Sequence, residues 1–304
     1  MIRSIKMETT PEITLVTGGT GFVGRRLLPL LADSGRVRCL VEGKTSVSQL
    51  RHSHVEYVHG SFLDRDAIKR TLRGCGRVVH LEGVPQESRR VVFRRIDAGT
   101  KLLAEEMKNS GVRRLVMLSL VGAAADAPYP FLRAQARAES HLLGSGVPAA
   151  ILRTTILYGR GDNFVERILD WSRFLPFIPI PVSGTRRLQP LHSADLAFAL
   201  LRMLDEDETG VWEVGGPEIL TVDEAVAMVA RASDRHGSLV HLPRPLIRAS
   251  AVVLEAFSRW PPLTLAQIDA FQANHLCPRD SFERRFGRPA RTFEEGLRDF
   301  HIRS

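Results

Sequence analysis

Three glycines recur at intervals of three residues in the segment Thr17-Gly18-Gly19-Thr20-Gly21-Phe22-Val23-Gly24. They follow the apolar run 13–17 directly and precede a helical pattern. Because Gly18 and Gly21 carry no side chain, the backbone there can turn tightly and approach a diphosphate, whose charge the N-terminus of the next helix stabilises. Gly24 lets that helix pack closely on the strand. The spacing predicts a dinucleotide-binding turn, and a tight strand–helix turn without a ligand is the alternative.

The second apolar run, 37–41, ends in Glu42-Gly43-Lys44. An acidic side chain at this place accepts hydrogen bonds from the adenosine ribose hydroxyls of NAD, whereas a basic one pairs with the 2′-phosphate of NADP. Glu42 therefore favours NAD, and Lys44 keeps NADP open. A solvated charge in a turn is the alternative for either residue.

The elements that must position this turn alternate in the first half of the chain. Short β-branched runs alternate with stretches whose apolar residues recur every three or four positions. Such alternation predicts an α/β fold with a Rossmann-type, doubly wound parallel sheet. The predicted strands are Ile13–Thr17, Val37–Val41, Val55–His59, Arg77–Leu81, Arg114–Ser119 and Ala149–Arg153, and the predicted helices are Val23–Ala32, Asp64–Leu72, Gly99–Asn109 and Leu132–Leu143.

The second half of the chain is looser and richer in Gly and Pro. We expect residues 12–157 and about 186–214 to form the dinucleotide-binding domain. Residues 158–185 and 215–304 are expected to form a small C-terminal α/β lobe over the cleft at the carboxyl edge of the sheet, where open α/β folds bind ligands. The predicted elements are a strand over Val211–Val214 and helices over Ser193–Leu204, Val222–Ala232, Leu246–Phe257 and Leu265–Ala273.

Further short segments accompany the glycine turn: Val78-Val79-His80-Leu81, Gly99-Thr100, Leu118-Ser119, Ile151-Leu152-Arg153-Thr154, Tyr158-Gly159, Gln189-Pro190-Leu191-His192 and Glu213-Val214-Gly215-Gly216-Pro217-Glu218 before Leu220-Thr221. With the turn, they resemble the short-chain dehydrogenase/reductase superfamily in its atypical and extended branches. The likeness extends to the NDUFA9-like group, named after an accessory subunit of mitochondrial complex I. It covers nearly the whole chain and is more specific for fold and cofactor class than for substrate.

Redox members of that superfamily typically carry a Ser, a Tyr and a Lys. The Tyr transfers a proton, while the Lys lowers its pKa and holds the nicotinamide ribose. By resemblance, Ser119 takes the Ser position, Phe131 the Tyr position and Gln135 the Lys position. Phe131 has no proton to give and Gln135 carries no charge. The usual proton relay is therefore predicted to be absent.

A shifted register pairs Tyr129 with Arg133 instead, but Pro130 places Tyr129 before the first helical turn. The turn after the third predicted strand also differs, since Ser61 stands where the family usually has an Asp that contacts adenine. Together, the motif and the resemblance predict dinucleotide contacts from Gly18, Gly21, Phe22, Val23, Gly24, Glu42, Lys44, Leu81, Ser119 and Gln135.

Two further side chains are candidates for acid–base chemistry. Glu82 stands where the family has small or apolar residues along the nicotinamide path. A buried carboxylate there needs an Arg partner, and a replacement catalytic base is the alternative. His192 precedes a helix whose N-cap we expect to be Ser193. It is interpreted as a hydrogen-bonded loop histidine, with an acid or base near the substrate as the alternative.

The composition of the 304 residues, 44% hydrophobic and 25% charged, is that of an ordinary globular protein. The net charge of +8 comes from scattered arginines, and with only three Tyr and three Trp the chain lacks the interleaved aromatics of a nucleic-acid groove. Cys39, Cys75 and Cys277 have no metal spacing and predict reduced thiols in a cytoplasmic protein. The proline-broken apolar run 174–182 predicts either a buried lid loop or contact with a membrane surface or partner.

Two functions are consistent with these residues. In the first, the chain is an NAD(P)-binding protein whose dinucleotide stabilises the fold while its surface serves assembly or regulation through a small-molecule or protein partner, including a membrane complex. In the second, it is an oxidoreductase or epimerase-like enzyme that transfers hydride between NAD(P)H and a small or quinone-like substrate. The missing Tyr and Lys favour the first.

Overall fold

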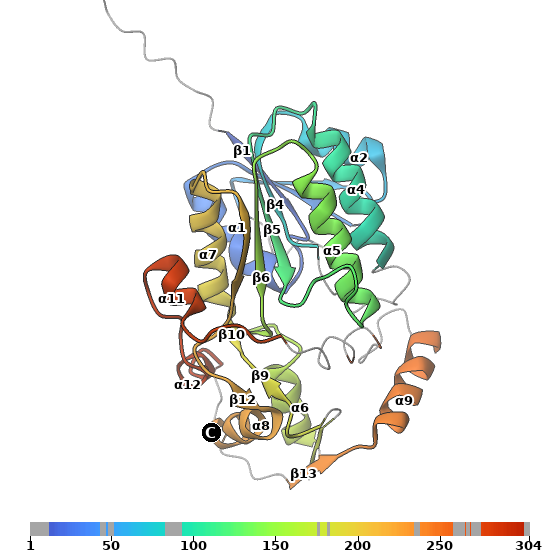
Figure 1. Ribbon diagram of the computed structural model, residues 1–304, viewed down its shortest axis with the longest axis vertical. Helices are drawn as coiled ribbons and strands as arrows, with labels where there is room; N and C mark the ends of the chain where they lie inside the picture. Colours follow the sequence, from blue (N-terminus) through green and yellow to red (C-terminus); the bar gives the residue numbers. More distant parts are fainter. Residues whose placement is uncertain are drawn as a thin grey trace, which may run out of the picture.

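The computed structural model describes residues 12–42, 47, 52–82, 93–174, 177–180, 183–233, 238–257, 265, 268 and 275–300. Lys44 and most of the predicted helix 265–273 lie outside these residues. A seven-stranded sheet in the order β3-β2-β1-β4-β5-β6-β11 forms the centre (Figure 1). Its strands are β1 (Ile13–Thr17), β2 (Val37–Val41), β3 (Val55–His59), β4 (Cys75–His80), β5 (Arg114–Leu120), β6 (Ala149–Thr154) and β11 (Gly210–Val214).

Every neighbouring pair of strands in this sheet runs parallel. From β1 the chain winds outward through β2 to β3, and it then crosses to β4 on the other side of β1. The loops that leave β1 and β4 therefore diverge, and a doubly wound sheet binds its ligands at such a point. The predicted Rossmann-type parallel sheet is confirmed.

Two layers of helices cover the sheet (Figure 1). On one face lie α1 (Phe22–Ser34) and α7 (Ser193–Asp205). On the other lie α2 (Arg65–Leu72), α4 (Thr100–Met107) and α5 (Pro130–Leu143), with the π-helical turn η2 (Arg95–Gly99) leading into α4. Each layer buries an apolar stripe against the strands, which is the main source of stability for such helices.

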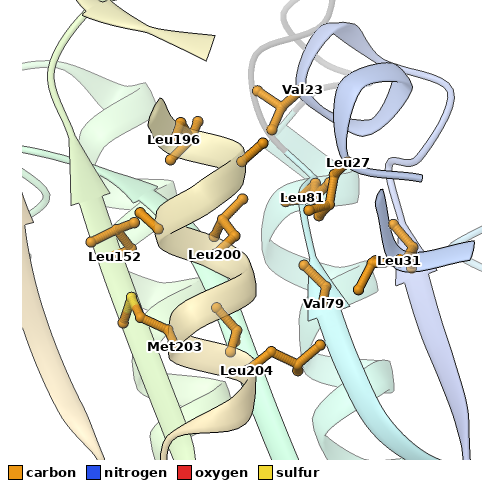
Figure 2. Packing of buried hydrophobic residues seen from close by; sticks show 14 of the residues in the cluster. Val23, Leu27, Leu31, Val79, Leu81, Leu152, Leu196, Leu200, Met203 and Leu204 are labelled. Atoms are coloured by element: carbon orange, nitrogen blue, oxygen red, sulfur yellow. The ribbon is translucent and has the colours of Figure 1, made fainter. Parts of the chain in front are cut away.

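The apolar core between α1, α7 and the sheet is continuous with the glycine turn. Figure 2 shows Leu200 and Leu204 of α7 on the side of that helix toward Leu27 of α1, and Met203 on the side toward Leu152 of β6. All five of these side chains are buried. This packing fixes α1, and with it the turn that precedes α1, against the strands.

The remaining elements form a lobe beyond the carboxyl ends of the strands (Figure 1). It contains α6 (Val165–Phe174), α8 (Val222–Ala232) and α12 (Phe293–Leu297), with the strand pairs β7 (Leu157–Tyr158) and β10 (Leu191–His192), β9 (Arg187–Leu188) and β12 (Leu220–Thr221), and β8 (Phe177–Ile180) and β13 (Ser238–His241). The helix α9 (Arg244–Phe257) follows β13, and α11 (Ser281–Phe286) packs beside β11. Among the described residues, no helix combines the length and apolar character needed to cross a bilayer.

Most element bounds agree with the sequence prediction to within two residues, and the largest difference lies before α4. Helical structure begins at Phe93 rather than Gly99 and passes through the π-helical turn η2. The side chain of Asp97 in this turn accepts hydrogen bonds from Arg137 and His141 of α5. These contacts between distant segments stabilise a turn that the local periodicity of residues 93–99 does not indicate.

Candidate functional site

The glycine turn joins β1 to α1 through two close approaches of backbone. Gly18 has a φ of 69°, in the left-handed region that favours glycine, and a Cβ there would lie 2.8 Å from the carbonyl carbon of Leu81. A Cβ on Gly24 would lie 2.3 Å from the carbonyl oxygen of Gly19. The first turn of α1, which the structure describes completely, contains no acidic side chain. The backbone N–H groups at its N-terminus thus form an anion-binding end.

A neutral histidine secures the strand end that precedes the turn. His80 of β4 is fully buried, its Nδ1 lying 2.7 Å from the Thr17 hydroxyl and its Nε2 3.0 Å from the Thr100 hydroxyl. Burial lowers the pKa of His80 to about 3, so the ring is uncharged at neutral pH. It links β1, β4 and α4 directly beneath the glycine turn.

Glu42, at the end of β2, is held by the turn after β3. Its Oε1 accepts a hydrogen bond from the Ser61 hydroxyl at 2.9 Å, and its Oε2 accepts one from the backbone N–H of Phe62 at 2.9 Å. These bonds orient a half-buried carboxylate at the end of β2. Ser61 thus contacts Glu42 in the structure.

Glu82 is buried at the end of β4 and has an arginine partner. Its Oε2 lies 2.8 Å from Nη2 of Arg95, in the π-helical turn η2. Arg95 is thus the Arg partner that a buried carboxylate at this position needs. The ion pair also holds η2 to the end of β4. The role of Glu82 as a base stays a prediction.

Ser119 of β5 belongs to a polar network that crosses three strands. Its hydroxyl donates a hydrogen bond to Oε1 of Glu139 on α5 at 2.5 Å, and Glu139 is clamped by Nε and Nη2 of Arg153 at 3.0 and 2.7 Å. Arg153 of β6 also bonds Glu213 of β11 at 3.1 Å. Ser119, Arg153 and Glu213 are in register across the sheet, so their side chains share one face. The hydroxyl proton of Ser119 is therefore directed to a carboxylate.

Phe131 and Gln135 lie one turn apart on α5, and each is 1% exposed. Phe131 packs into the apolar core beneath α4 and α5. Gln135 differs, because its side-chain oxygen is buried and has no hydrogen-bond partner among the described residues. An unpaired buried carbonyl is costly, so this oxygen suits a donor other than those of the described residues.

The shifted pair Tyr129 and Arg133 is not arranged as a proton relay. Tyr129 is the N-cap of α5, in an extended conformation just before Pro130. The guanidinium of Arg133 donates a hydrogen bond to the backbone oxygen of Ala127 at 2.6 Å. As the sequence predicted, α5 does not begin before Pro130.

His192 is fully buried at the start of α7, and it corrects one sequence prediction. The N-cap of α7 is His192 rather than Ser193, because its Nδ1 accepts a hydrogen bond from the backbone N–H of Ala194 at 3.3 Å. Its Nε2 lies 3.4 Å from Asp299 near α12, and burial lowers its pKa to about 4. The proposed role of His192 as an acid or base is untested, but these contacts connect α7 to the C-terminal segment.

Comparisons with known proteins add sequence relationships to this geometry. Residues 18–168 match the family described as NAD(P)H-binding. Over 279 residues the chain is 28% identical to NADH dehydrogenase [ubiquinone] 1 alpha subcomplex subunit 9, mitochondrial, of Arabidopsis thaliana, covering 87% of this chain and 68% of that protein. It is 27% identical over 251 residues to the ceramide reductase of Caulobacter vibrioides, covering 81% and 78% of the two chains. Residues 18–168 therefore match an NAD(P)H-binding domain, and the NADH dehydrogenase subunit and the ceramide reductase are relatives of this chain over most of its length.

Solved structures support the same fold. The UDP-glucose 4-epimerase of Thermus thermophilus, crystallised with NAD, superposes with a TM-score of 0.65 at 20% identity, covering 86% of this chain and 99% of that one. That of Thermotoga maritima, crystallised with UDP-glucose, gives 0.73 at 17% identity, covering 95% and 97%. At these identities the likeness extends to the fold alone.

The residues of this chain fit a nicotinamide dinucleotide at several independent places. A side chain at Gly18 would fill the close approach beside Leu81, and the N-terminus of α1 suits a diphosphate. The oriented carboxylate of Glu42 has the chemistry to accept hydrogen bonds from ribose hydroxyls, and the side-chain oxygen of Gln135, which has no partner among the described residues, suits another hydroxyl donor. When bound, the dinucleotide would donate or accept hydride.

Sequence reasoning missed Glu139, Arg153 and Arg95 as partners of the candidate residues. Arg153 was part of a recognised motif, but a motif does not reveal that the β5–β6 register places its side chain beside that of Ser119. Glu139 lies four residues after Gln135 on α5 and therefore on the same helical face, a spacing that could have drawn attention to it. Arg95 carries no local signal, because its pairing with Glu82 depends on the π-helical turn.

Proposed function

We propose that the protein binds a nicotinamide dinucleotide as a stabilising ligand and does not carry out proton transfer through the usual Tyr–Lys relay. This proposal is supported by the three side chains at the positions where the resemblance predicts proton transfer. Phe131 is a core side chain, Gln135 is uncharged, and the proton of Ser119 is donated to Glu139. None of the three is arranged to give a proton to a substrate carbonyl.

Glu42 supports NAD over NADP in this proposal. Its carboxylate is fixed by Ser61 and Phe62 at the end of β2, where a 2′-phosphate would meet a like charge, whereas ribose hydroxyls would find acceptors. Lys44, the residue that favours NADP, lies outside the described residues.

The proposed biological role is assembly or regulation. Relatives in Arabidopsis thaliana and Dictyostelium discoideum are named as subunits of NADH dehydrogenase. A bound dinucleotide stabilises the native state without turnover, by an amount that grows with the logarithm of its concentration relative to its dissociation constant, and would keep a partner-binding surface folded. We expect that surface to contact a membrane complex or its surroundings.

An oxidoreductase activity is the second candidate, favoured by Ser119 and Glu139 and by relatives named as reductases. In the oxidative direction, Ser119 would take the hydroxyl proton of an alcohol while its own proton passes to Glu139, as the carbon loses hydride to the dinucleotide. Arg153 donates hydrogen bonds to both oxygens of Glu139 and would hold that carboxylate beside Ser119. This direction needs no tyrosine.

The two functions are separated by measuring binding and turnover on the same preparation. Our proposal expects NAD to raise the melting temperature, while NADH is not oxidised in the presence of quinones, aldehydes or ketones and NAD is not reduced in the presence of alcohols. A turnover that Ser119→Ala abolishes, with dinucleotide binding retained, would establish the second function and contradict the first. Failure to bind either NAD or NADP would contradict both.

A further inference from the structure

The carboxyl edge of the seven-stranded sheet divides into two halves. The residues directly after β2, β1 and β4 are Glu42, Gly18 and Leu81, and each of them is a predicted dinucleotide contact. The other half is formed by β5, β6 and β11, whose carboxyl ends are crossed by a segment near the end of the chain. We call this segment, residues 275–281, the strap.

The two ends of the strap are bonded to the first residues beyond the two outer strands of this half. The imidazole Nδ1 of His275 lies 2.5 Å from the backbone oxygen of Val121, which follows β5. The hydroxyl of Ser281 accepts a hydrogen bond at 3.2 Å from the backbone N–H of Gly215, which follows β11. The strap therefore extends across the sheet edge from β5 to β11.

The middle of the strap is anchored by Gln189, which is fully buried. The side-chain oxygen of Gln189 accepts a hydrogen bond from the backbone N–H of Cys277 at 2.9 Å, and its amide nitrogen donates one to the backbone oxygen of Gly216 at 2.7 Å. Its backbone oxygen accepts a hydrogen bond at 2.5 Å from the hydroxyl of Thr155, the first residue after β6. These bonds fix the strap above β6 as well.

His275 is the strap residue that lies at β5, the neighbour of β4 in the sheet. A carbonyl oxygen can only accept a hydrogen bond, so the Nδ1 of His275 carries a proton and donates it to the oxygen of Val121. The half-buried ring is thus held at the boundary between the half of the edge that the strap crosses and the half with the predicted dinucleotide contacts.

Val121 lies level with Gln135 of α5. Because α5 joins two neighbouring parallel strands, it runs antiparallel to β5, and the bond between Ser119 and Glu139 puts these two residues level. Two residues further along the strand direction amount to about 6.6 Å, and four residues back along α5 to about 6 Å. His275 therefore meets the sheet at the level of Gln135, whose buried side-chain oxygen has no partner among the described residues.

A dinucleotide on this edge would meet the strap at β5. Its two nucleoside halves extend in opposite directions from the diphosphate. With the diphosphate at the turn after β1 and the adenosine at Glu42 after β2, the nicotinamide half extends over β4 toward β5. The strand order thus brings that half to the His275 end of the strap.

We propose that the strap forms the wall of the dinucleotide site on the side of β5, and that His275 positions this wall against the nicotinamide half. The wall is part of the proposed dinucleotide binding and rests on it. Since ADP has the adenosine and both phosphates but no nicotinamide half, loosening the wall weakens the binding of NAD and leaves that of ADP unchanged.

Calorimetric titration of the full-length protein with NAD and with ADP tests the proposal. His275→Leu removes the donor to Val121, and we expect it to weaken NAD binding about fivefold while the affinity for ADP stays the same. His275→Asn keeps an N–H donor near the place of Nδ1 and should bind NAD within about twofold of the wild type.

His54→Leu is the matched control. The Nδ1 of His54 lies 3.0 Å from the backbone oxygen of Ala32, so this variant loses a bond of the same kind. His54 directly precedes β3 and therefore lies at the amino edge of the sheet, away from the predicted dinucleotide contacts. Its affinities for NAD and ADP should equal those of the wild type. Thermal unfolding of each variant shows whether it is folded.

Hydrogen–deuterium exchange of the wild type locates the contact independently of any substitution. We expect NAD to slow exchange at the backbone N–H groups of Cys277 and Gly215, which donate the bonds that hold the strap. ADP should leave the exchange of these groups unchanged, whereas both ligands should slow exchange in the glycine turn.

Four results would overturn the proposal. They are an unchanged NAD affinity in His275→Leu, an equal loss of affinity for NAD and ADP, a loss in His275→Asn as large as that in His275→Leu, and an exchange rate in the strap that NAD does not change. None of them contradicts the proposed function, which fails instead, and this wall with it, if the wild type binds neither NAD nor NADP.

Discussion

The turn after β1 and the residues of β5 and α5 lie around the same sheet, yet they differ in how closely they resemble the pattern of the short-chain dehydrogenase/reductases. The turn keeps its three glycines, its close backbone approaches and an uncapped helix N-terminus. On β5 and α5, Ser119 is bonded to Glu139, and Phe131 and Gln135 occupy the places that the resemblance predicts for Tyr and Lys. The turn has the features that bind a dinucleotide, whereas β5 and α5 lack the usual groups that transfer a proton during its reaction. The two properties can therefore be tested separately.

The largest effect is expected for Arg153, because we interpret the network of Ser119, Glu139 and Arg153 as structural. Arg153→Met leaves the carboxylate of Glu139 buried without its cation, and we expect it to lower the free energy of unfolding by about 3 kcal/mol. Chemical denaturation measures the change. Arg113→Met is the control, since Arg113 is 75% exposed beside Glu12 and its loss should cost less than about 1 kcal/mol. Equal effects of the two variants would show that the network contributes little to the fold.

The histidine beneath the glycine turn predicts a pH dependence of stability. Because burial depresses the pKa of His80 from 6.5 to about 3, the unfolded chain binds the proton more readily between these values. His80 should therefore lower stability by about 1.4 kcal/mol per unit as the pH falls from 6 toward 4, and have no such effect above pH 7. The variant His80→Gln should show a shallower slope in urea unfolding. An unchanged slope would mean that His80 is protonated in the folded protein.

The choice between NAD and NADP depends on Glu42. Glu42→Gln removes the negative charge that favours ribose hydroxyls, so NAD should bind about tenfold more weakly while NADP binds no worse. Fluorescence titration gives both dissociation constants. Glu56→Gln, on exposed β3, makes the same change in net charge and should alter neither. A fall in NADP affinity equal to that for NAD would remove Glu42 from the specificity argument.

The smallest effect is expected for Gln135, where one substitution should raise the stability of the free protein and weaken the binding of NAD. Gln135→Leu removes a buried oxygen that has no partner among the described residues, so the free protein should become about 1 kcal/mol more stable. The same change removes a proposed acceptor for a ligand hydroxyl, so NAD should bind about fivefold more weakly. Melting curves with and without NAD measure both. Loss of stability without any change in NAD affinity would assign Gln135 to the core alone.

The parts of this fold that depend on local pattern were predictable. The glycine spacing, the strand–helix alternation and Pro130 at the start of α5 each act within a few residues. The partners of Ser119 and Glu82 were not, because they depend on strand register and on a π-helical turn. The N-cap of α7 was misassigned because His192 and Ser193 can both accept a backbone hydrogen bond, and only the helix start distinguishes them. The sequence thus identified Ser119, Glu82 and His192 as candidates, whereas their polar partners depend on contacts between distant segments.

The central claim, that the turn after β1 binds a nicotinamide dinucleotide, is tested most directly by calorimetric titration of NAD into the wild type and Gly18→Ala. The wild type should bind one NAD per chain. The alanine should abolish measurable binding while the protein stays folded by circular dichroism, because its Cβ would press on the backbone of Leu81 at a positive φ. NAD binding of equal affinity in the two proteins, or no binding of NAD or NADP by the wild type, would contradict the account.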